Sequence, residues 1–401
     1  MNVVLSIEAV RPPLAGIGRY VWELATRLPR HQEVETLRFI SDGLWRALPD
    51  LSLAMNASNA SNASIPAANS ISTANHSFDW RHLLGKNPLV SRLYGAVMPR
   101  LAAFQINRLR DTVFHGPNFF VPNVDLPTVV TIHDLSAYYP SDWHPQTRID
   151  RMRSLIPHAV NRASMVLTDS FATKQELLQE FNLPVDKVQA IPLGVDPVYH
   201  PRPISDLVDV LGQYGLQAQA YSLFVSTIEP RKNIANLISA YEQLPLAMRQ
   251  RWPLVLVGGQ GWNSKEIHAR IERAAAQSWL KYLGYVPQAH LPLLYAGARL
   301  FTYPSLYEGF GLPIAEAMAS GVPVLTSNCS SMPEVAGSAA LLVEPKNVDE
   351  ICIKLEQGLN DDQWRSVAIS RGLERATQLS WEACVDKTLL AYKMAKSRAE
   401  K

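Results

Sequence analysis

The sequence predicts an α/β protein made of two halves with parallel sheets, and three observations support this. Short apolar runs alternate with segments of helical spacing along most of the chain, a pattern typical of β-α-β units. At 401 residues the chain is longer than a single hydrophobic core usually serves. A proline-rich stretch near 197–218 separates two such series and reads as a linker.

The first predicted domain covers residues 1–200. It is expected to open with a strand at 2–10 and a helix at 18–28. Further strands are expected at 111–116, 127–134, 164–170 and 188–196, with a helix at 171–181.

The second predicted domain covers residues 201–380. Strands are expected at 221–228, 252–259, 279–286, in the run LFTYPS and at 323–328. A long final helix, 381–401, is expected to cross back onto the first domain.

Composition narrows the class of protein. A hydrophobic content of 47% and a charged content of 18% fit a globular protein with ample core material. The net charge of +2 argues against nucleic acid as a partner. The 3 cysteines lack metal-ligand spacing, and the first residues lack a secretory pattern. The sequence therefore predicts a cytoplasmic protein.

Two segments depart from the α/β pattern. Residues 52–77 are rich in Asn, Ser and Ala, so a flexible insertion is expected there. Residues 80–110 carry arginine and lysine but no acidic residue. One interpretation is contact with an anionic membrane surface, on the inner face of the cytoplasmic membrane. The other is a core-facing helix pair with a solvated basic edge.

Two glutamates, Glu308 and Glu316, lie on either side of a Gly-Phe-Gly loop. Pro313 suits the first turn of a helix and Gly321 suits its end. We therefore expect Glu308 in the loop and Glu316 in the first helical turn. A helix start beside a glycine loop favours phosphate, and carboxylates accept hydrogen bonds from sugar hydroxyls. Alternatively, Glu316 only complements the helix dipole.

Cations follow a strand of the same half. Arg231 and Lys232 come directly after the predicted strand 221–228, and ligands of parallel sheets bind beyond the carboxyl ends of strands. Arginine grips phosphate through two N–H groups and lysine adds a point charge. The plainer alternative is a solvated basic turn.

The first half offers weaker signals. Gly16 and Gly18 lie between the first strand and its helix, where a tight turn lets a ligand approach the backbone. His133 and Asp134 stand at a strand end, where a histidine bonds hydroxyls or oxyanions. A histidine at such a place is also commonly structural.

The chain resembles glycosyltransferase family 4 through motifs that occur in the order AGIGRY, TIHDL, TDSFAT, IPLGVD, EPRKN, VGGQGW, LGYV and EGFGLPIAE. That family is retaining and metal-independent, and has the GT-B fold of two Rossmann-like domains facing across a cleft. The resemblance covers the chain apart from 52–77 and parts of 80–110. One departure is Ala15, where the family frequently has glycine, so this loop would be less permissive.

The resemblance implies a role for each matched residue. Glu316 would bind the donor ribose, Glu308 the transferred sugar, and Val286 would lie near the base. The implied catalytic residues are His133, Glu308, Arg231 and Lys232. The implied donor-binding residues are Gly16, Gly18, Arg231, Lys232, Val286, Glu308, Phe310, Gly311, Leu312 and Glu316. No metal and no cofactor are implied.

The implied function is transfer of a hexose with retained anomeric configuration. We expect mannose or rhamnose, from a GDP-linked donor, moving to a growing lipid-linked glycan of O-antigen or another surface polysaccharide. A UDP-sugar donor, a sugar-nucleotide epimerase and a non-catalytic sugar-nucleotide-binding protein stay open as alternatives. A nicotinamide dehydrogenase is disfavoured because the glycine fingerprint is incomplete.

Overall fold

The computed structural model describes residues 1–11, 14, 16–50, 97–98, 100–139 and 143–399. Two compact units make up the chain. The first unit comprises Met1–Val130, Asn161–Ser164 and Tyr392–Lys401, and the second comprises Thr131–Val160 and Met165–Ala391. The domain limits at 200 and 380 stay a prediction. The expected loop 52–77 and most of 80–110 lie outside the described residues.

One sheet belongs to the first half of the sequence and has the strand order β3-β2-β1-β4-β5-β6-β7. Its strands run parallel except β3, which is antiparallel to β2. The strands are β1 Asn2–Ser6, β2 Thr36–Ser41, β3 Leu44–Arg46, β4 Thr112–Gly116, β5 Thr128–Ile132, β6 Met165–Thr168 and β7 Val188–Ala190. Its helices are α1 Ile17–Arg27, α5 Gln146–Arg162 and α6 Phe171–Phe181.

The predicted strands of this sheet are confirmed, while β2 and β3 were not predicted. β4 and β5 are buried at every residue, which explains their unbroken apolar character, since helices cover both faces of a parallel sheet. β2 is largely exposed or half-buried and lies towards the edge of the sheet. Its apolar signal is correspondingly weak.

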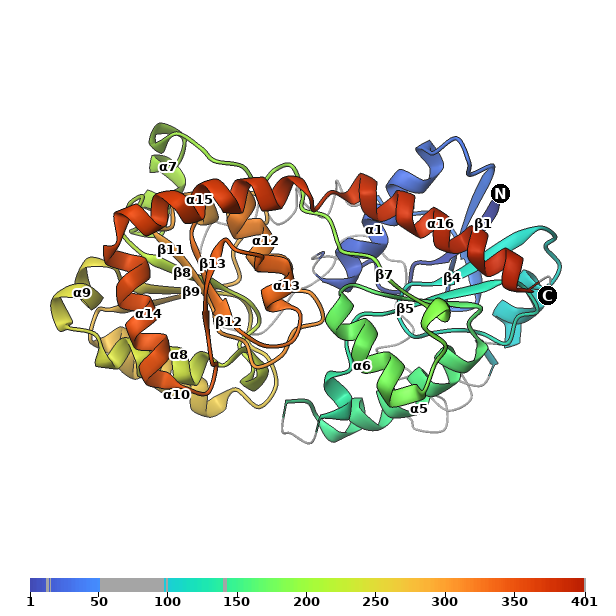
Figure 1. Ribbon diagram of the computed structural model, residues 1–401, viewed down its shortest axis with the longest axis horizontal. Helices are drawn as coiled ribbons and strands as arrows, with labels where there is room; N and C mark the ends of the chain where they lie inside the picture. Colours follow the sequence, from blue (N-terminus) through green and yellow to red (C-terminus); the bar gives the residue numbers. More distant parts are fainter. Residues whose placement is uncertain (12–13, 15, 51–96, 99, 140–142, 400–401) are drawn as a thin grey trace, which may run out of the picture. The chain divides into compact units, whose positions relative to one another are not determined.

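The second sheet has the order β10-β9-β8-β11-β12-β13 and is parallel throughout. Its strands are β8 Ser222–Val225, β9 Leu254–Val257, β10 Leu280–Gly284, β11 Leu300–Tyr303, β12 Val324–Ser327 and β13 Ala340–Val343. Figure 1 shows helices on both faces, with α12 and α15 on one side and α8 and α10 on the other. All predicted strands here are confirmed, and β13 is additional.

The helices that follow the first sheet are α7 Val208–Gln213, α8 Ile234–Gln243, α9 Leu246–Arg251, α10 Lys265–Ala276, α11 Leu291–Gly297, α12 Leu312–Ala319, α13 Met332–Ala336, α14 Val348–Asn360, α15 Asp362–Thr377 and α16 Trp381–Ala399. The 3-10 turns are η1 Leu28–Arg30, η2 Ser136–Tyr138, η3 Val185–Lys187, η4 Ile204–Asp206 and η5 Pro230–Lys232. None of the helices in the described ranges is both long enough and apolar enough to span a bilayer.

The second sheet reverses its strand order between β8 and β11. To one side the order runs back through β9 and β10, and to the other it runs on through β12 and β13. Connections leave this point in opposite directions, so the loops beyond the carboxyl ends of β8 and β11 leave room for a ligand. Arg231 follows β8 and Glu308 follows β11.

The final helix α16 contributes its last residues to the first unit. The ring Nδ1 of His115, on β4, lies 2.8 Å from Oη of Tyr392. Lys393 forms an ion pair with Glu33 at 2.5 Å, and Lys396 pairs with Asp111. The end of the chain is therefore packed onto the unit that contains its beginning.

Candidate active site

The two predicted cations lie in η5, the first helical turn after β8. Pro230 opens this turn, where the N–H that proline lacks is not needed. Asn233 closes it with φ of 59°, a conformation that asparagine tolerates. The Nδ2 of Asn233 donates to the carbonyl oxygen of Pro304 at 2.9 Å. This bond ties the turn carrying Arg231 and Lys232 to the end of β11.

Glu308 accepts hydrogen bonds from both cations. Nη1 of Arg231 donates to Oε2 at 3.0 Å and Nζ of Lys232 donates to Oε1 at 2.7 Å. The exposed fractions of these three side chains are 11%, 8% and 8%. Lys232 also donates to Oη of Tyr303 at 2.8 Å. The structure thus brings three predicted site residues together and contradicts the alternative of a solvated basic turn.

A second carboxylate, Glu229, was missed by sequence reasoning. Nη2 of Arg231 donates to its Oε1 at 2.8 Å, and Glu229 is buried. Burial alone would raise the pKa of Glu308, but Lys232 and Arg231 outweigh it and lower that pKa to about 2. Burial and the neighbouring Arg231 lower the pKa of Lys232. Two buried cations and two buried carboxylates therefore balance one another, and removing any one leaves an uncompensated charge.

One nitrogen of the Arg231 guanidinium is left without a partner among the described residues. Its Nη1 also donates to the carbonyl oxygen of Tyr307 at 2.7 Å. Its buried Nε has no hydrogen-bond partner within the part of the chain that the structure describes. Leaving a buried N–H unsatisfied is unfavourable, so this group is suited to an oxyanion ligand.

The Gly-Phe-Gly loop leads into α12 as predicted. Gly311 precedes the helix with φ of 103°, a conformation open to glycine and rarely to other residues. Phe310 is buried, and its carbonyl oxygen accepts a hydrogen bond from Oγ of Ser331 at 2.8 Å. Leu312 is the first helical residue and Pro313 the second. The amides of this helix start form an electropositive end next to Glu308.

Glu316 lies deeper in the helix than predicted. Because Gly311 lets α12 begin at Leu312, Glu316 falls in the second turn, and the first turn holds no acidic residue. Its Oε2 accepts a hydrogen bond from Oη of the fully buried Tyr295 at 2.9 Å. The dipole effect is confined to the first turn, so the alternative that Glu316 only complements the helix dipole does not fit its position.

His133 has a partner that the sequence did not reveal. Its Nδ1 lies 2.7 Å from Oδ2 of Asp169, and the exposed fractions of the two side chains are 11% and 6%. Asp134, the next residue, is half-buried. Burial opposes its ionisation, but Arg231 and the hydrogen bonds from Ser136 lower its pKa.

The loop that carries Glu308 packs against the end of β5. A Cβ added to Gly309 would lie 1.9 Å from the carbonyl oxygen of His133, so only glycine fits. Oγ of Ser170 donates to the carbonyl oxygen of Gly309 at 2.7 Å. His133 and the glutamate loop, predicted from separate halves, are thus neighbours in the second unit.

Gly16 and Gly18 lie in the first unit. Gly16 precedes α1 with φ of 49°. A Cβ at Gly18, the second residue of α1, would lie 2.7 Å from the carbonyl oxygen of Ala9, so packing of the helix against the loop after β1 requires this glycine. Ala15 lies outside the described residues. A ligand role for this loop stays a prediction.

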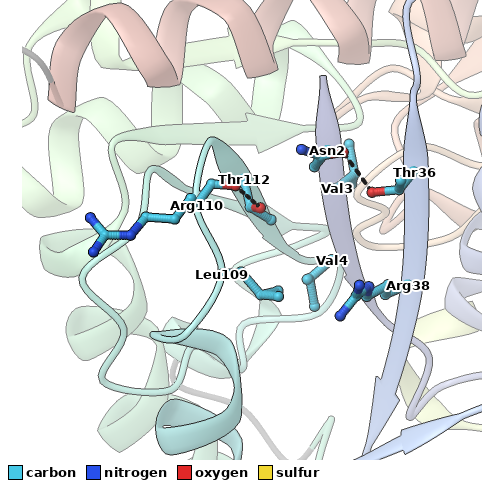
Figure 2. Close-up of a pocket in the computed structure, with 8 residues that line it drawn as sticks. All are labelled: Asn2, Val3, Val4, Thr36, Arg38, Leu109, Arg110 and Thr112. Atoms are coloured by element: carbon cyan, nitrogen blue, oxygen red, sulfur yellow. Dashed lines mark hydrogen bonds between the residues drawn. The ribbon is translucent and has the colours of Figure 1, made fainter.

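Val286 and a small pocket lie apart from the cluster of ion pairs. Val286 is buried shortly after β10, at the carboxyl edge of the second sheet. A pocket of about 230 Å³ lies elsewhere, at the amino ends of β1, β2 and β4. Figure 2 shows Arg110 pointing away from the other lining residues, so its charge does not converge with that of Arg38. Within the first sheet, this pocket lies at the amino ends of the strands, whereas His133 follows the carboxyl end of β5.

Two family descriptions match the chain. Glycosyltransferase Family 4 matches residues 14–199 and Glycosyl transferases group 1 matches residues 213–375. The O-antigen chain mannosyltransferase B of Escherichia coli is 39% identical over 98% of this chain and 100% of that protein. The O-antigen chain mannosyltransferase RfbU of Salmonella typhimurium is 28% identical over 54% of this chain and 56% of that protein.

Solved structures share the fold. The Anabaena protein HepE, in complex with UDP and glucose, has a TM-score of 0.68 at 20% identity, covering 98% of this chain and 99% of that chain. WaaG, a glycosyltransferase involved in lipopolysaccharide biosynthesis, has a TM-score of 0.65 at 15% identity, covering 97% and 98%. The predicted fold class and enzyme class are confirmed, and the chain belongs to glycosyltransferase family 4.

Proposed function

We propose that this glycosyltransferase moves mannose from GDP-mannose to a lipid-linked glycan in O-antigen synthesis, with retained anomeric configuration and without a metal ion. The names of its relatives support mannose and O-antigen. The observation that carries the proposal is the cluster of Arg231, Lys232 and Glu308 at the switch point of the second sheet.

In this proposal the diphosphate of the donor binds beside Arg231, Lys232 and the start of α12. The unpartnered Nε of Arg231 and the ammonium of Lys232 would face its oxygens, and the start of α12 would add its amides. Negative charge grows on the departing diphosphate as the glycosidic bond breaks. Fixed donors placed to receive that charge contribute roughly 3 kcal/mol each to lowering the barrier.

Ion pairs hold the guanidinium of Arg231 in position before the donor binds. Glu308 and Glu229 hold the guanidinium of Arg231 from two sides, so its fork cannot swing away. Little reorganisation is then needed in the transition state, which is the property that makes electrostatic stabilisation effective. No cofactor enters this scheme.

The proposed reaction breaks one bond in the donor and forms one bond to the acceptor. The bond between the anomeric carbon and the diphosphate oxygen breaks, and a new bond to the acceptor oxygen forms on the same face of the sugar. The acceptor proton passes to the departing phosphate oxygen. Glu316 would hold the ribose and His133 would lie beside the transferred sugar.

We also propose that part of the 80–110 segment contacts an anionic membrane. Within its described part, Leu101 and Phe104 are 38% and 58% exposed. The guanidinium of Arg108 lies 4.0 Å from the ring centre of Phe104. Exposed apolar side chains beside cations suit a lipid headgroup region. Arg92 lies outside the described residues.

Membrane contact is tested by replacing Arg92, Arg100 and Arg108 with serine together. Sedimentation with anionic vesicles should fall, since each basic side chain near the leaflet contributes about 1 kcal/mol. A control triple variant replaces three surface cations of the second unit, Lys265, Arg273 and Arg371. Equal binding by both triple variants would favour the core-facing alternative.

The sugar-transfer proposal is tested by nucleoside diphosphate release from GDP-mannose, GDP-rhamnose and UDP-sugars, with and without EDTA. Release from GDP-mannose that EDTA leaves unchanged would support it. Faster release from a UDP-sugar would show that the donor is UDP-linked and would contradict GDP-mannose. Loss of release on addition of EDTA would contradict metal independence. Absence of both binding and release with every donor would contradict the assignment of the site.

A further inference from the structure

Two neighbouring strands each place a side chain directly beyond their carboxyl end. His133 follows the last residue of β5, and Asp169 follows the last residue of β6. β5 and β6 are adjacent in the first sheet. Parallel neighbours end at the same edge of a sheet, which accounts for the 2.7 Å separation of Nδ1 and Oδ2. The function proposed above uses His133 but gives Asp169 no role.

The chemistry of the pair defines the state of the imidazole. An ionised carboxylate only accepts hydrogen bonds, so Nδ1 of His133 donates its N–H to Asp169. The neutral ring then carries its lone pair on Nε2, and the protonated ring carries a second N–H there. Rotation of the ring would exchange a nitrogen for a carbon and break this bond. Asp169 therefore selects both the tautomer and the orientation of the ring.

The pair is also held against the glutamate loop. The carbonyl oxygen of His133 abuts Gly309, and Ser170, which follows Asp169, donates to the carbonyl oxygen of Gly309. The backbone of His133 and the residue after Asp169 therefore both contact Gly309, which is next to Glu308. An imidazole fixed in this way has a defined position relative to the cluster of ion pairs.

Burial makes the pair costly to dismantle. The side chain of Asp169 is 6% exposed, and burial raises its pKa although His133 opposes the shift. Asp134 adds a like charge nearby. A buried carboxylate is retained only with a good hydrogen-bond partner, and here the partner is the imidazole.

We propose that Asp169 is a positioning residue for sugar transfer, which acts by fixing the tautomer and orientation of His133. This inference rests on the proposed function, because it requires that His133 contribute to turnover. The alternative is that Asp169 serves folding alone, and the experiment is designed to separate the two.

The experiment is a double-mutant cycle on the full-length enzyme, with GDP release from GDP-mannose as the measurement. Asp169→Asn is nearly isosteric but offers an amide that either accepts from or donates to the ring. We expect kcat to fall by about 10- to 100-fold, with KM for the donor changed by less than about threefold. In the His133→Ala background, the same substitution should have almost no further effect on kcat.

A matched control removes a partner from another buried histidine. Tyr392→Phe deletes the hydroxyl that lies 2.8 Å from Nδ1 of His115. We expect this variant to lower the melting temperature by an amount similar to Asp169→Asn while kcat stays within about twofold. A drop in kcat as large as that of Asp169→Asn would mean that any lost histidine partner impairs turnover, which overturns the proposal.

A spectroscopic measurement tests the tautomer without relying on activity. Among the resonances of enzyme labelled with ¹⁵N-histidine, the signal that disappears in His133→Ala should report an imidazole with its proton on Nδ1. In Asp169→Asn this resonance should shift or show tautomer exchange. An unchanged resonance would overturn the proposal.

The outcomes distinguish this inference from the proposed function. If the wild-type enzyme turns over GDP-mannose and Asp169→Asn lowers kcat equally in both backgrounds, Asp169 acts independently of His133 and this inference alone fails. If no sugar nucleotide is turned over by the wild type, the proposed function fails and this inference fails with it.

Discussion

The two sheets share a strand order but use the ends of their strands differently. From β8 to β13, the order of the second sheet repeats that of β1 to β6 in the first. The second sheet gathers Arg231, Lys232 and Glu308 at its point of reversal. The first sheet places a glycine turn after β1 and carries the pair His133 and Asp169 further along, after β5 and β6.

The difference shows one strand order presenting two kinds of polar group. Charges at the reversal of the second sheet are paired and largely buried, which suits the charged leaving group of the proposed reaction. The first sheet instead pairs one imidazole with one carboxylate, which suits the proposed contact with an uncharged sugar. The predictions that follow test whether this division of labour holds.

The largest expected effect is that of Arg231→Ala. It removes the forked donor and leaves Glu308 and Glu229 without their shared cation. We expect kcat/KM for donor turnover to fall by about 1,000-fold, measured by nucleoside diphosphate release. Arg231→Lys is the matched variant, because it keeps the charge without the fork, and it should recover part of the loss. A loss below about tenfold in the alanine variant would contradict the placement of the diphosphate here.

Glu308 should make the free energy of unfolding fall at acidic pH. Its pKa is lowered from 4.5 to about 2 in the folded state, so the unfolded chain binds this proton at a higher pH than the folded chain does. Its contribution, about 3 kcal/mol, is present above about pH 4.5 and is lost as the pH falls towards 2. Urea unfolding across this range measures the free energy of unfolding.

Glu308→Gln should flatten that profile between pH 4.5 and 2 and lower stability at neutral pH, because two buried cations lose their counter-charge. The exposed Glu374→Gln serves as the control and should follow the wild-type curve. Parallel curves for all three proteins would show that Glu308 is not the source of the acid sensitivity.

Glu316→Ala tests the nucleotide side of the second sheet. Loss of hydrogen bonds between a carboxylate and ribose hydroxyls should weaken GDP binding by about 10- to 100-fold, and turnover of the donor should collapse. The hydroxyl of the fully buried Tyr295 loses its acceptor, so the melting temperature should fall modestly while the protein stays folded. Calorimetric binding of GDP checks this, and near-normal affinity would remove Glu316 from the site.

Gly309→Ala tests the contact between the glutamate loop and the end of β5. Its added methyl group would meet the carbonyl oxygen of His133, so the free energy of unfolding should fall by about 1–3 kcal/mol. Gly259→Ala is the control, since open space surrounds that position. Equal stability of the two variants would mean that the two regions are not packed together as described.

The sequence predicted helices and strands better than it predicted which side chains contact one another. Apolar runs such as 127–134 located β5 because burial on both faces leaves an unbroken signal. Pro313 located the start of α12, since proline fits only the first turn. The turn occupied by Glu316 was misjudged, because the left-handed Gly311 starts the helix earlier than proline alone suggests.

The missed residues, Asp169 and Glu229, share one cause. Each forms a hydrogen bond with a functional residue, His133 or Arg231, and this pairing is seen only in the folded structure. Arg231 and Glu308 are 77 positions apart, and their contact depends on β8 and β11 being neighbours. Strand order of this kind follows from packing between elements, which local spacing does not encode. The signal available for both was an acidic residue in the loop that follows a strand, directly after β6 for Asp169 and shortly after β8 for Glu229.

The packing of α16 onto the first unit has a consequence for synthesis of the protein. Tyr392, Lys393 and Lys396 bond residues from the opening part of the chain. At about 5–20 residues per second, a ribosome makes them roughly 20–80 seconds after the first strand emerges. Until then His115 has no hydroxyl beside it and part of the first sheet stays uncovered. A fragment that ends at residue 200 would keep that nascent state permanently, so the first half is best produced together with its distant last helix.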